Sequence, residues 1–137
     1  MTAFAKIKQW NQTRKLLDKD FNIDNELAMI QEEILESCTD MKSEEARQVA
    51  QMIIKKEVTR FKVDDLDPEQ VVDAFADIIV FATGAIYKLG YDTDKVMEEV
   101  IKEISSRVGT IKEGKFVKDT SDLAKKRWHT ADFKKCK

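Results

Sequence analysis

The stretch that decides the fold is Val71-Val72-Asp73-Ala74-Phe75-Ala76-Asp77-Ile78-Ile79-Val80-Phe81-Ala82. It is one of the most apolar parts of the chain, yet it contains two acids. Asp73 and Asp77 are four residues apart, so on a helix they lie on the same face. A buried carboxylate without a partner costs several kcal/mol and usually takes up a proton or binds a cation. We therefore expect a positive group to face these two aspartates.

The residues around this stretch predict where its helix begins and ends. In Asp67-Pro68-Glu69-Gln70, Asp67 suits the N-cap, Pro68 the first helical position and Gln70 the capping-box position. Gly90 ends the helix after Leu89. Because the helix is apolar nearly all round, we expect it to be central and the most buried in the fold.

Apolar residues at helical spacing predict four more helices. The first spans residues 3–17, and the second begins at Asp24 or Asn25 and carries the stripe Leu27, Ile30, Ile34 and Leu35. Another runs from Ser43 to about residue 59, and the last from Asp92 or Thr93 to about Val108. The tail after Gly109 is expected to be irregular, with a short helix around 121–127.

The composition agrees with a helical fold. One proline and four glycines leave few turn-forming residues. The fold class predicted is all-α: one domain over 1–137, with a four- to five-helix bundle over about 3–108 and a basic, partly irregular tail over 109–137.

The charge is unevenly placed along the chain. The formal net charge is -2, but residues 111–137 carry nine Lys/Arg and four acids, which makes that segment +5 and the remainder -7. An acidic body with a basic tail suits a site that holds cations and phosphates together, although a solvated tail is an equal alternative.

The remaining composition indicates a cytoplasmic protein. Cys38 and Cys136 match no metal or redox spacing, which implies a reducing compartment. The N-terminus lacks the apolar stretch of a signal peptide. No run reaches the roughly 18–20 apolar residues of a membrane span, so no membrane partner is expected.

The second helix carries the acids that could complete a site. Glu32, Glu33 and Glu36 lie on roughly one side of it, and Asp73 and Asp77 could face them from an antiparallel helix. Such oxygen-rich clusters suit Mg²⁺, and zinc is disfavoured because no His or Cys is near. The alternatives are a solvated glutamate face and, for Asp73, an acid favoured by the helix dipole.

These motifs resemble the all-α nucleoside triphosphate pyrophosphohydrolase superfamily, which includes MazG-like enzymes and phosphoribosyl-ATP pyrophosphohydrolase. The resemblance covers about residues 3–133 and is clearest in Trp10-Asn11, 30–36, 72–80 and 89–95. The tail is similar to that of phosphoribosyl-ATP-pyrophosphohydrolase-like members, phage-encoded ones among them.

The resemblance implies hydrolysis of a nucleotide between its α- and β-phosphates, with Mg²⁺, or Mn²⁺ in its place, as cofactor. It implies catalytic and metal-site roles for Glu32, Glu33 and Glu36 and a metal-site role for Asp77, with Asp73 as a further candidate ligand. It also implies a homodimer or homotetramer. By position and charge, the candidates for binding substrate and phosphate are Arg107, Lys115, Lys125, Lys126 and Trp10.

Two departures from the family pattern favour an alternative. Ala74 replaces the acid usual three residues before Asp77, and Ile104 stands where an Asn is frequent. The alternative is a non-catalytic helical nucleotide-binding or regulatory module. Trp10 could instead be a core anchor, the lysines a solvated surface and His129 an incidental surface residue. Nucleic-acid binding is disfavoured because no nucleic-acid motif is recognisable.

Overall fold

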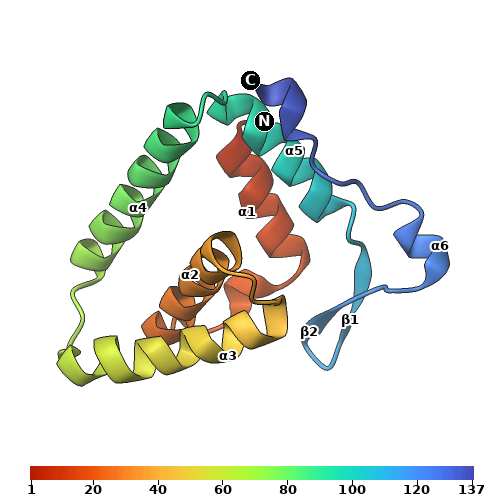
Figure 1. Ribbon diagram of the computed structural model, residues 1–137. Coiled ribbons are helices and arrows are strands. Elements are labelled where there is room, and N and C mark those ends of the chain that lie inside the picture. The colour runs from red at the N-terminus through yellow and green to blue at the C-terminus, as the bar shows by residue number, and fades with distance from the viewer. The chain divides into compact units, whose positions relative to one another are not determined.

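The computed structural model describes all residues 1–137 and contains six α-helices and one two-stranded sheet (Figure 1). Five helices have eleven or more residues, and α6 has four. The all-α prediction is confirmed. The chain divides into two compact units: unit 1 comprises Met1–Lys19 and Glu69–Lys137, and unit 2 comprises Asp20–Pro68. The predicted single domain stays a prediction.

Unit 1 is built on α1 (Ala3–Thr13) packed against α5 (Thr93–Ser105). A 3-10 turn, η1 (Leu16–Asp18), follows α1. As predicted, Asp92 caps α5 and accepts a hydrogen bond from the backbone N–H of Lys95. The helix ends at Ser105, three residues earlier than expected, because the chain turns there into a strand.

Helix α4 (Pro68–Lys88) has the predicted bounds, but its predicted burial is wrong. It ends where Gly90 adopts a φ of 90°. None of its residues is buried, and no other helix of unit 1 packs along it. The side chains of Val72, Val80 and Phe81 are 68%, 64% and 75% exposed. The apolar sequence therefore shows that α4 needs a cover, but unit 1 does not supply one.

The same helix differs from the expectation that no segment of the chain is long and apolar enough to cross a membrane. By length and composition alone, α4 is apolar enough to cross a membrane, with a mean hydropathy of 1.4. Core helices of soluble proteins pass the same test. Asp73 and Asp77 within it would be costly in a bilayer, and the absence of a membrane partner stays a prediction.

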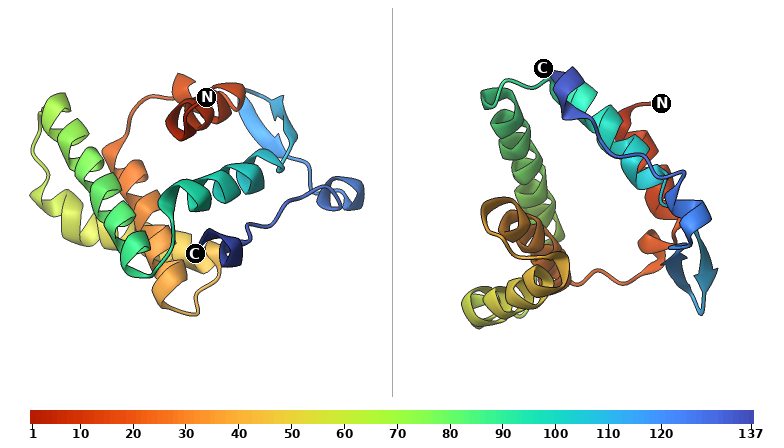
Figure 2. Two further views of the ribbon diagram at one scale, coloured as in Figure 1. Left: turned by 90° about the horizontal axis from the view of Figure 1, so that it is seen from above. Right: turned by 45° about the vertical axis from the view of Figure 1, so that its right-hand side comes forward.

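A β-hairpin follows α5, where irregular chain was predicted (Figure 2). Strands β1 (Gly109–Lys112) and β2 (Lys115–Lys118) pair antiparallel, with Ile111 opposite Phe116. The two-residue turn places Glu113 and Gly114 at φ values of 52° and 77°. Positive φ at both positions is the backbone of the tight turn that best matches strand twist. A side chain on Gly109 would collide with the carbonyl of Val117, so the hairpin starts at a glycine.

The last residues of the chain are held to α5 by one buried carboxylate. Beyond the short α6 (Asp122–Lys125), the chain returns to α5 and ends in the 3-10 turn η4 (Phe133–Cys136). Glu99, 2% exposed, accepts a 3.1 Å hydrogen bond from the backbone N–H of Asp132 and lies 3.2 Å from Lys135 Nζ. Burial alone would raise the pKa of Glu99, but this N–H and the ammonium groups of Lys135 and Lys102 outweigh it and lower the pKa to about 2.

Unit 2 is a helical hairpin. Its helices are α2 (Ile23–Cys38), capped by Asn22 rather than by the predicted Asp24 or Asn25, and α3 (Ser43–Ile53). A π-helical turn (Ile54–Val58) and a 3-10 turn (Thr59–Phe61) extend α3 to about the predicted end. The buried residues Ala28, Ala46 and Ala50 have small side chains, which let the two helices approach closely.

Candidate functional site

The three glutamates of α2 form one acidic cluster in unit 2. The α2 helix presents Glu32 and Glu36 as half-buried side chains and Glu33 as an exposed one. Desolvation and the negative charges of Glu36 and Glu32 raise the pKa of Glu33. The mutual repulsion shows that the three carboxylates share one side of the helix, as their spacing predicts. A cation bound there would relieve this repulsion.

One member of the cluster already has a cationic neighbour. Arg47 of α3 donates from Nε to Glu32 Oε1 at 3.2 Å, and the arginine side chain is 65% exposed. The Glu32 side chain is 14% exposed, but the water around the arginine screens the pair and keeps its contribution to about 1 kcal/mol. The ion pair therefore orients Glu32, and a more strongly bound cation could replace Arg47 as its partner.

The two aspartates of α4 are exposed, so the expectation that they are buried is wrong. Asp73 and Asp77 project from the same side of a helix that nothing in unit 1 covers. Because water solvates both carboxylates, neither of them requires a positively charged partner. They belong to unit 1 and the three glutamates to unit 2, so assembly of these acids into one metal site stays a prediction.

The donor set nevertheless fits a hard divalent cation. All five predicted ligands are carboxylates, the type that Mg²⁺ and Mn²⁺ prefer. Within either unit, no three His, Cys, Asp or Glu side chains converge on a common point that could hold a metal. A metal bound by α2 would therefore need oxygen ligands from outside that helix, such as substrate phosphates or water.

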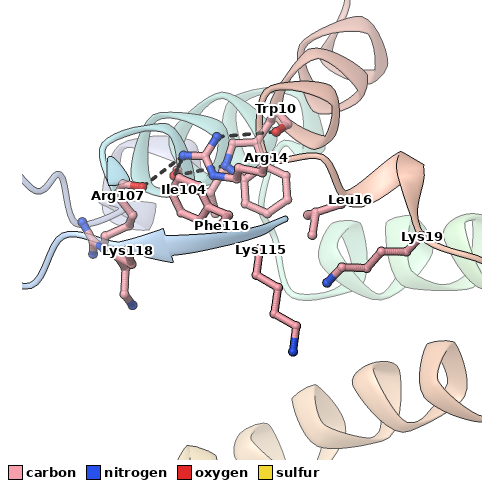
Figure 3. A pocket seen from close by; sticks show the side chains of 9 residues that line it. All are labelled: Trp10, Arg14, Leu16, Lys19, Ile104, Arg107, Lys115, Phe116 and Lys118. Atoms are coloured by element: carbon pink, nitrogen blue, oxygen red, sulfur yellow. Dashed lines mark hydrogen bonds between the residues drawn. The ribbon is translucent and has the colours of Figure 1, made fainter. Parts of the chain in front are cut away.

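Unit 1 contains a cavity of about 440 Å³ that is rich in positive charge (Figure 3). We call it the basic pocket. It is lined by residues of α1, η1, α5 and β2 and of the segments that follow η1 and α5: Trp10, Arg14, Leu16, Lys19, Ile104, Arg107, Lys115, Phe116 and Lys118. Five of these nine side chains are cationic and none is acidic, so the arrangement suits an anion.

Arg14 organises the back of the basic pocket. Its guanidinium lies 4.6 Å from the ring centroid of Trp10 and 4.7 Å from that of Phe116. It also donates to the backbone oxygens of Ile104 at 3.4 Å and Arg107 at 3.0 Å, and the same Ile104 oxygen accepts a 3.2 Å hydrogen bond from Trp10 Nε1 (Figure 3). These carbonyls lie at the negative end of α5, which favours a cation there. Burial lowers the pKa of the Arg14 guanidinium from its usual value.

Trp128 organises the side of the pocket nearest α6. Its ring lies 4.4 Å from the guanidinium of Arg107 and 5.4 Å from Lys118 Nζ. Arg107 also donates to the backbone oxygen of His129 at 3.0 Å, and its one acidic neighbour, Glu103, is 3.8 Å away. Aromatic faces and neutral carbonyls thus place these cations while leaving most of their charge available.

The structure brings together three of the five predicted phosphate-binding residues: Trp10, Arg107 and Lys115. The indole of Trp10 is half-buried and anchors α1 to α5, so the core-anchor interpretation also holds. Lys125 and Lys126 are exposed on or beside α6 and do not line the pocket. His129 lies 3.4 Å from Glu99 and belongs to the tail attachment.

Sequence reasoning missed the other cationic residues of the pocket, Arg14, Lys19 and Lys118, and the ring of Phe116. A weak signal for two of them was present in the short segments Thr110-Ile111-Lys112 and Lys115-Phe116-Val117-Lys118, which flank the turn-forming Glu113-Gly114. This pattern predicts a hairpin, and the hairpin carries Phe116 and Lys118 toward α1. Ile104, where the resemblance implies an Asn, contributes an apolar side chain to the same pocket.

Comparison with known proteins agrees with the all-α fold. The sequence model of the family described as phosphoribosyl-ATP pyrophosphohydrolase matches residues 6–103. The matched region contains all five candidate metal ligands, and the hairpin and tail lie beyond it. No curated protein and no solved structure gave a match.

Proposed function

The chain belongs to the phosphoribosyl-ATP pyrophosphohydrolase family, and from this premise we propose that it hydrolyses a nucleotide between its α- and β-phosphates. Water and a nucleoside triphosphate, or a related nucleotide, would give a monophosphate, pyrophosphate and a proton. The observation that carries the proposal is the acidic cluster of α2, which lies inside the matched region and whose members raise the pKa of Glu33.

In this proposal Glu32, Glu33 and Glu36 hold Mg²⁺, with Asp77 and Asp73 as further ligands. When bound, the metal neutralises phosphate charge and polarises water. The chain's own residues orient the substrate, and one of the three glutamates accepts the proton of the attacking water. Arg47 holds Glu32 in place at 3.2 Å until the cation binds.

The test is a panel of nucleoside triphosphates and phosphoribosyl-ATP, incubated with Mg²⁺ and assayed for monophosphate and pyrophosphate. Glu36→Gln and Asp77→Asn should each lower kcat by at least about 100-fold, since general base or metal-site groups typically contribute that much. Glu44→Gln is the matched control, because Glu44 is an exposed acid on α3. Equal activity in all three variants would refute the assignment of the site.

A second readout does not depend on activity. Because Glu36 and Glu32 raise the pKa of Glu33, Glu36→Gln should lower the pKa of Glu33 measured by NMR titration. Mg²⁺ should lower that pKa in the unmodified protein as well. A pKa that responds to neither change would show that the carboxylates do not act as one cluster.

We also propose that the chain associates with itself through α4. Support comes from the exposed Val72, Val80 and Phe81, because soluble monomers rarely leave apolar faces of this extent in water. Light scattering should show a dimer or tetramer at micromolar concentration, and Phe81→Lys should shift it toward monomer. A monomeric unmodified protein would contradict this proposal. We also propose a cytoplasmic location, from the spacing of Cys38 and Cys136, which matches no metal or redox motif.

Ala74 and Ile104 support the alternative function, which is nucleotide binding without hydrolysis. At Ala74, α4 lacks an acid beside Asp73 and Asp77, and Ile104 places an apolar side chain in the basic pocket. Calorimetry distinguishes the two functions. Nucleotide binding without products supports the alternative, and products support hydrolysis.

A further inference from the structure

The basic pocket is an open cavity in which two half-buried arginines and three exposed lysines converge. Its volume of about 440 Å³ lies within the roughly 300–1,000 Å³ usual for small-ligand sites. Its cations come from four separate parts of unit 1, namely the C-cap of α1, the segment after η1, the segment after α5, and β2. Because these parts converge on one space with no acid in the lining, mutual repulsion among the cations must be offset in another way.

Aromatic rings and carbonyls provide most of that offset, and the carboxylate of Glu103, 3.8 Å from Arg107, provides the rest. Arg14 is placed between Trp10 and Phe116, and Arg107 and Lys118 both lie against Trp128. A ring face attracts a cation without neutralising it, whereas a carboxylate would cancel its charge. The pocket therefore holds preorganised positive charge.

Two further cations have no partner and are free to bind a ligand. Lys19 and Lys115 make no ion pair, and Figure 3 shows both side chains extending from the open side of the pocket. Five positive groups match an anion with several negative charges spaced along its length. A single carboxylate or sulfate would leave most of this charge uncompensated.

We propose that the basic pocket binds a linear polyphosphate group without help from a metal ion. The group is either the phosphate chain of a nucleotide or free pyrophosphate. Arg14, Arg107 and Lys118 form the preorganised wall, and Lys19 and Lys115 close on the outer phosphates. The inference rests on the proposed function only in naming phosphate as the anion.

The test is isothermal titration calorimetry in EDTA with inorganic triphosphate as the probe. The unmodified protein should bind it, and Lys115→Ala and Lys118→Ala should each weaken binding roughly tenfold, as expected for loss of one charged contact. Lys112→Ala is the matched control: Lys112 pairs with Lys115 across the hairpin but lies outside the pocket. Its affinity should stay within about twofold of the unmodified protein.

Further titrations identify the source of the phosphate. Tighter binding of a nucleoside triphosphate than of pyrophosphate supports the substrate chain as the occupant, and tighter binding of pyrophosphate supports the free product. Tighter binding of a single-stranded oligonucleotide than of either, with the same loss in Lys115→Ala, would overturn the proposal. Absence of triphosphate binding in EDTA, or an equal loss in Lys112→Ala, would overturn it as well.

The outcome is separable from that of the proposed function. Triphosphate binding in EDTA without any product in Mg²⁺ would leave the pocket standing and refute hydrolysis. Turnover with an unchanged KM in the Lys115→Ala and Lys118→Ala variants would refute the pocket and leave hydrolysis standing.

Discussion

Replacing Arg14 with alanine tests how α1, α5 and the hairpin are held together. Arg14 makes a 3.0 Å hydrogen bond to the Arg107 oxygen, a longer 3.4 Å bond to the Ile104 oxygen, and contacts with the rings of Trp10 and Phe116. A hydrogen bond from a charged donor contributes about 1.5–3 kcal/mol, and a partly exposed cation–ring contact about 0.5–1 kcal/mol. Because the 3.4 Å bond is weak and such contacts are not additive, we expect Arg14→Ala to lower the free energy of unfolding of unit 1 by about 3 kcal/mol.

The assay is urea denaturation followed by tryptophan fluorescence. Both tryptophans, Trp10 and Trp128, lie in unit 1, so the signal reports that unit. With a urea dependence of roughly 1.5 kcal/mol per molar for a unit of this size, the midpoint should fall by roughly 2 M. Arg14→Lys should show about half that fall, since an ammonium can bond one carbonyl but cannot stack as a flat guanidinium does.

The control is Lys8→Ala, which removes the same charge from an exposed position on the same helix. Its midpoint should move by no more than a few tenths of a molar. Equal midpoints for Arg14→Ala and Lys8→Ala would show that the stacked arginine contributes only its charge, and the reasoning would be wrong.

Two further predictions concern the tail and the hairpin. Since the pKa of Glu99 is lowered to about 2 in the folded chain, its contribution to stability is present above its unfolded value of about 4.5 and is lost as the pH falls from about 4.5 to about 2. The urea midpoint, measured by fluorescence at each pH, should therefore drop over this range. The drop should be smaller in Glu99→Gln than in the exposed control Glu98→Gln. Equal drops in the two variants would contradict the role given to Glu99. Gly109→Ala should destabilise unit 1 because its methyl group would meet the Val117 carbonyl, whereas Gly84→Ala, with open space around it inside α4, should stabilise the chain by about 0.5–1 kcal/mol. Thermal melting followed by circular dichroism compares these two variants, and a Gly109→Ala melt as high as that of the unmodified chain would show that the hairpin adjusts.

Local signals in the sequence predicted the helices well. Asp92 caps α5 as expected, and Pro68 and Gly90 bound α4 where their backbone preferences place them. Caps and breakers act through neighbouring residues, so a single sequence reveals them. The hairpin was not predicted because each strand has only four residues. A segment this short and rich in charged residues shows no clear alternation of apolar and polar side chains.

The candidate site was harder to predict because its parts are distant in sequence. The shared face of the α2 glutamates was predicted from their spacing, and the effect of Glu36 and Glu32 on the pKa of Glu33 agrees with it; their role in a site stays a prediction. Arg14 was missed because it resembles any charged residue at the end of a surface helix. Its role depends on the backbone oxygens of Ile104 and Arg107, which lie 90 and 93 residues further along the chain. For α4, hydrophobicity indicated that a cover is needed but not which element supplies it.

The attachment of the tail to α5 gives the chain two thiols of opposite accessibility. Cys136 is 1% exposed, and burial together with the charge of Glu99 raises its pKa, whereas Cys38 is exposed at the end of α2. A maleimide should therefore modify Cys38 at once and Cys136 only when the tail detaches. The slow labelling rate would then report how often the last residues leave α5, with no mutation introduced into the chain.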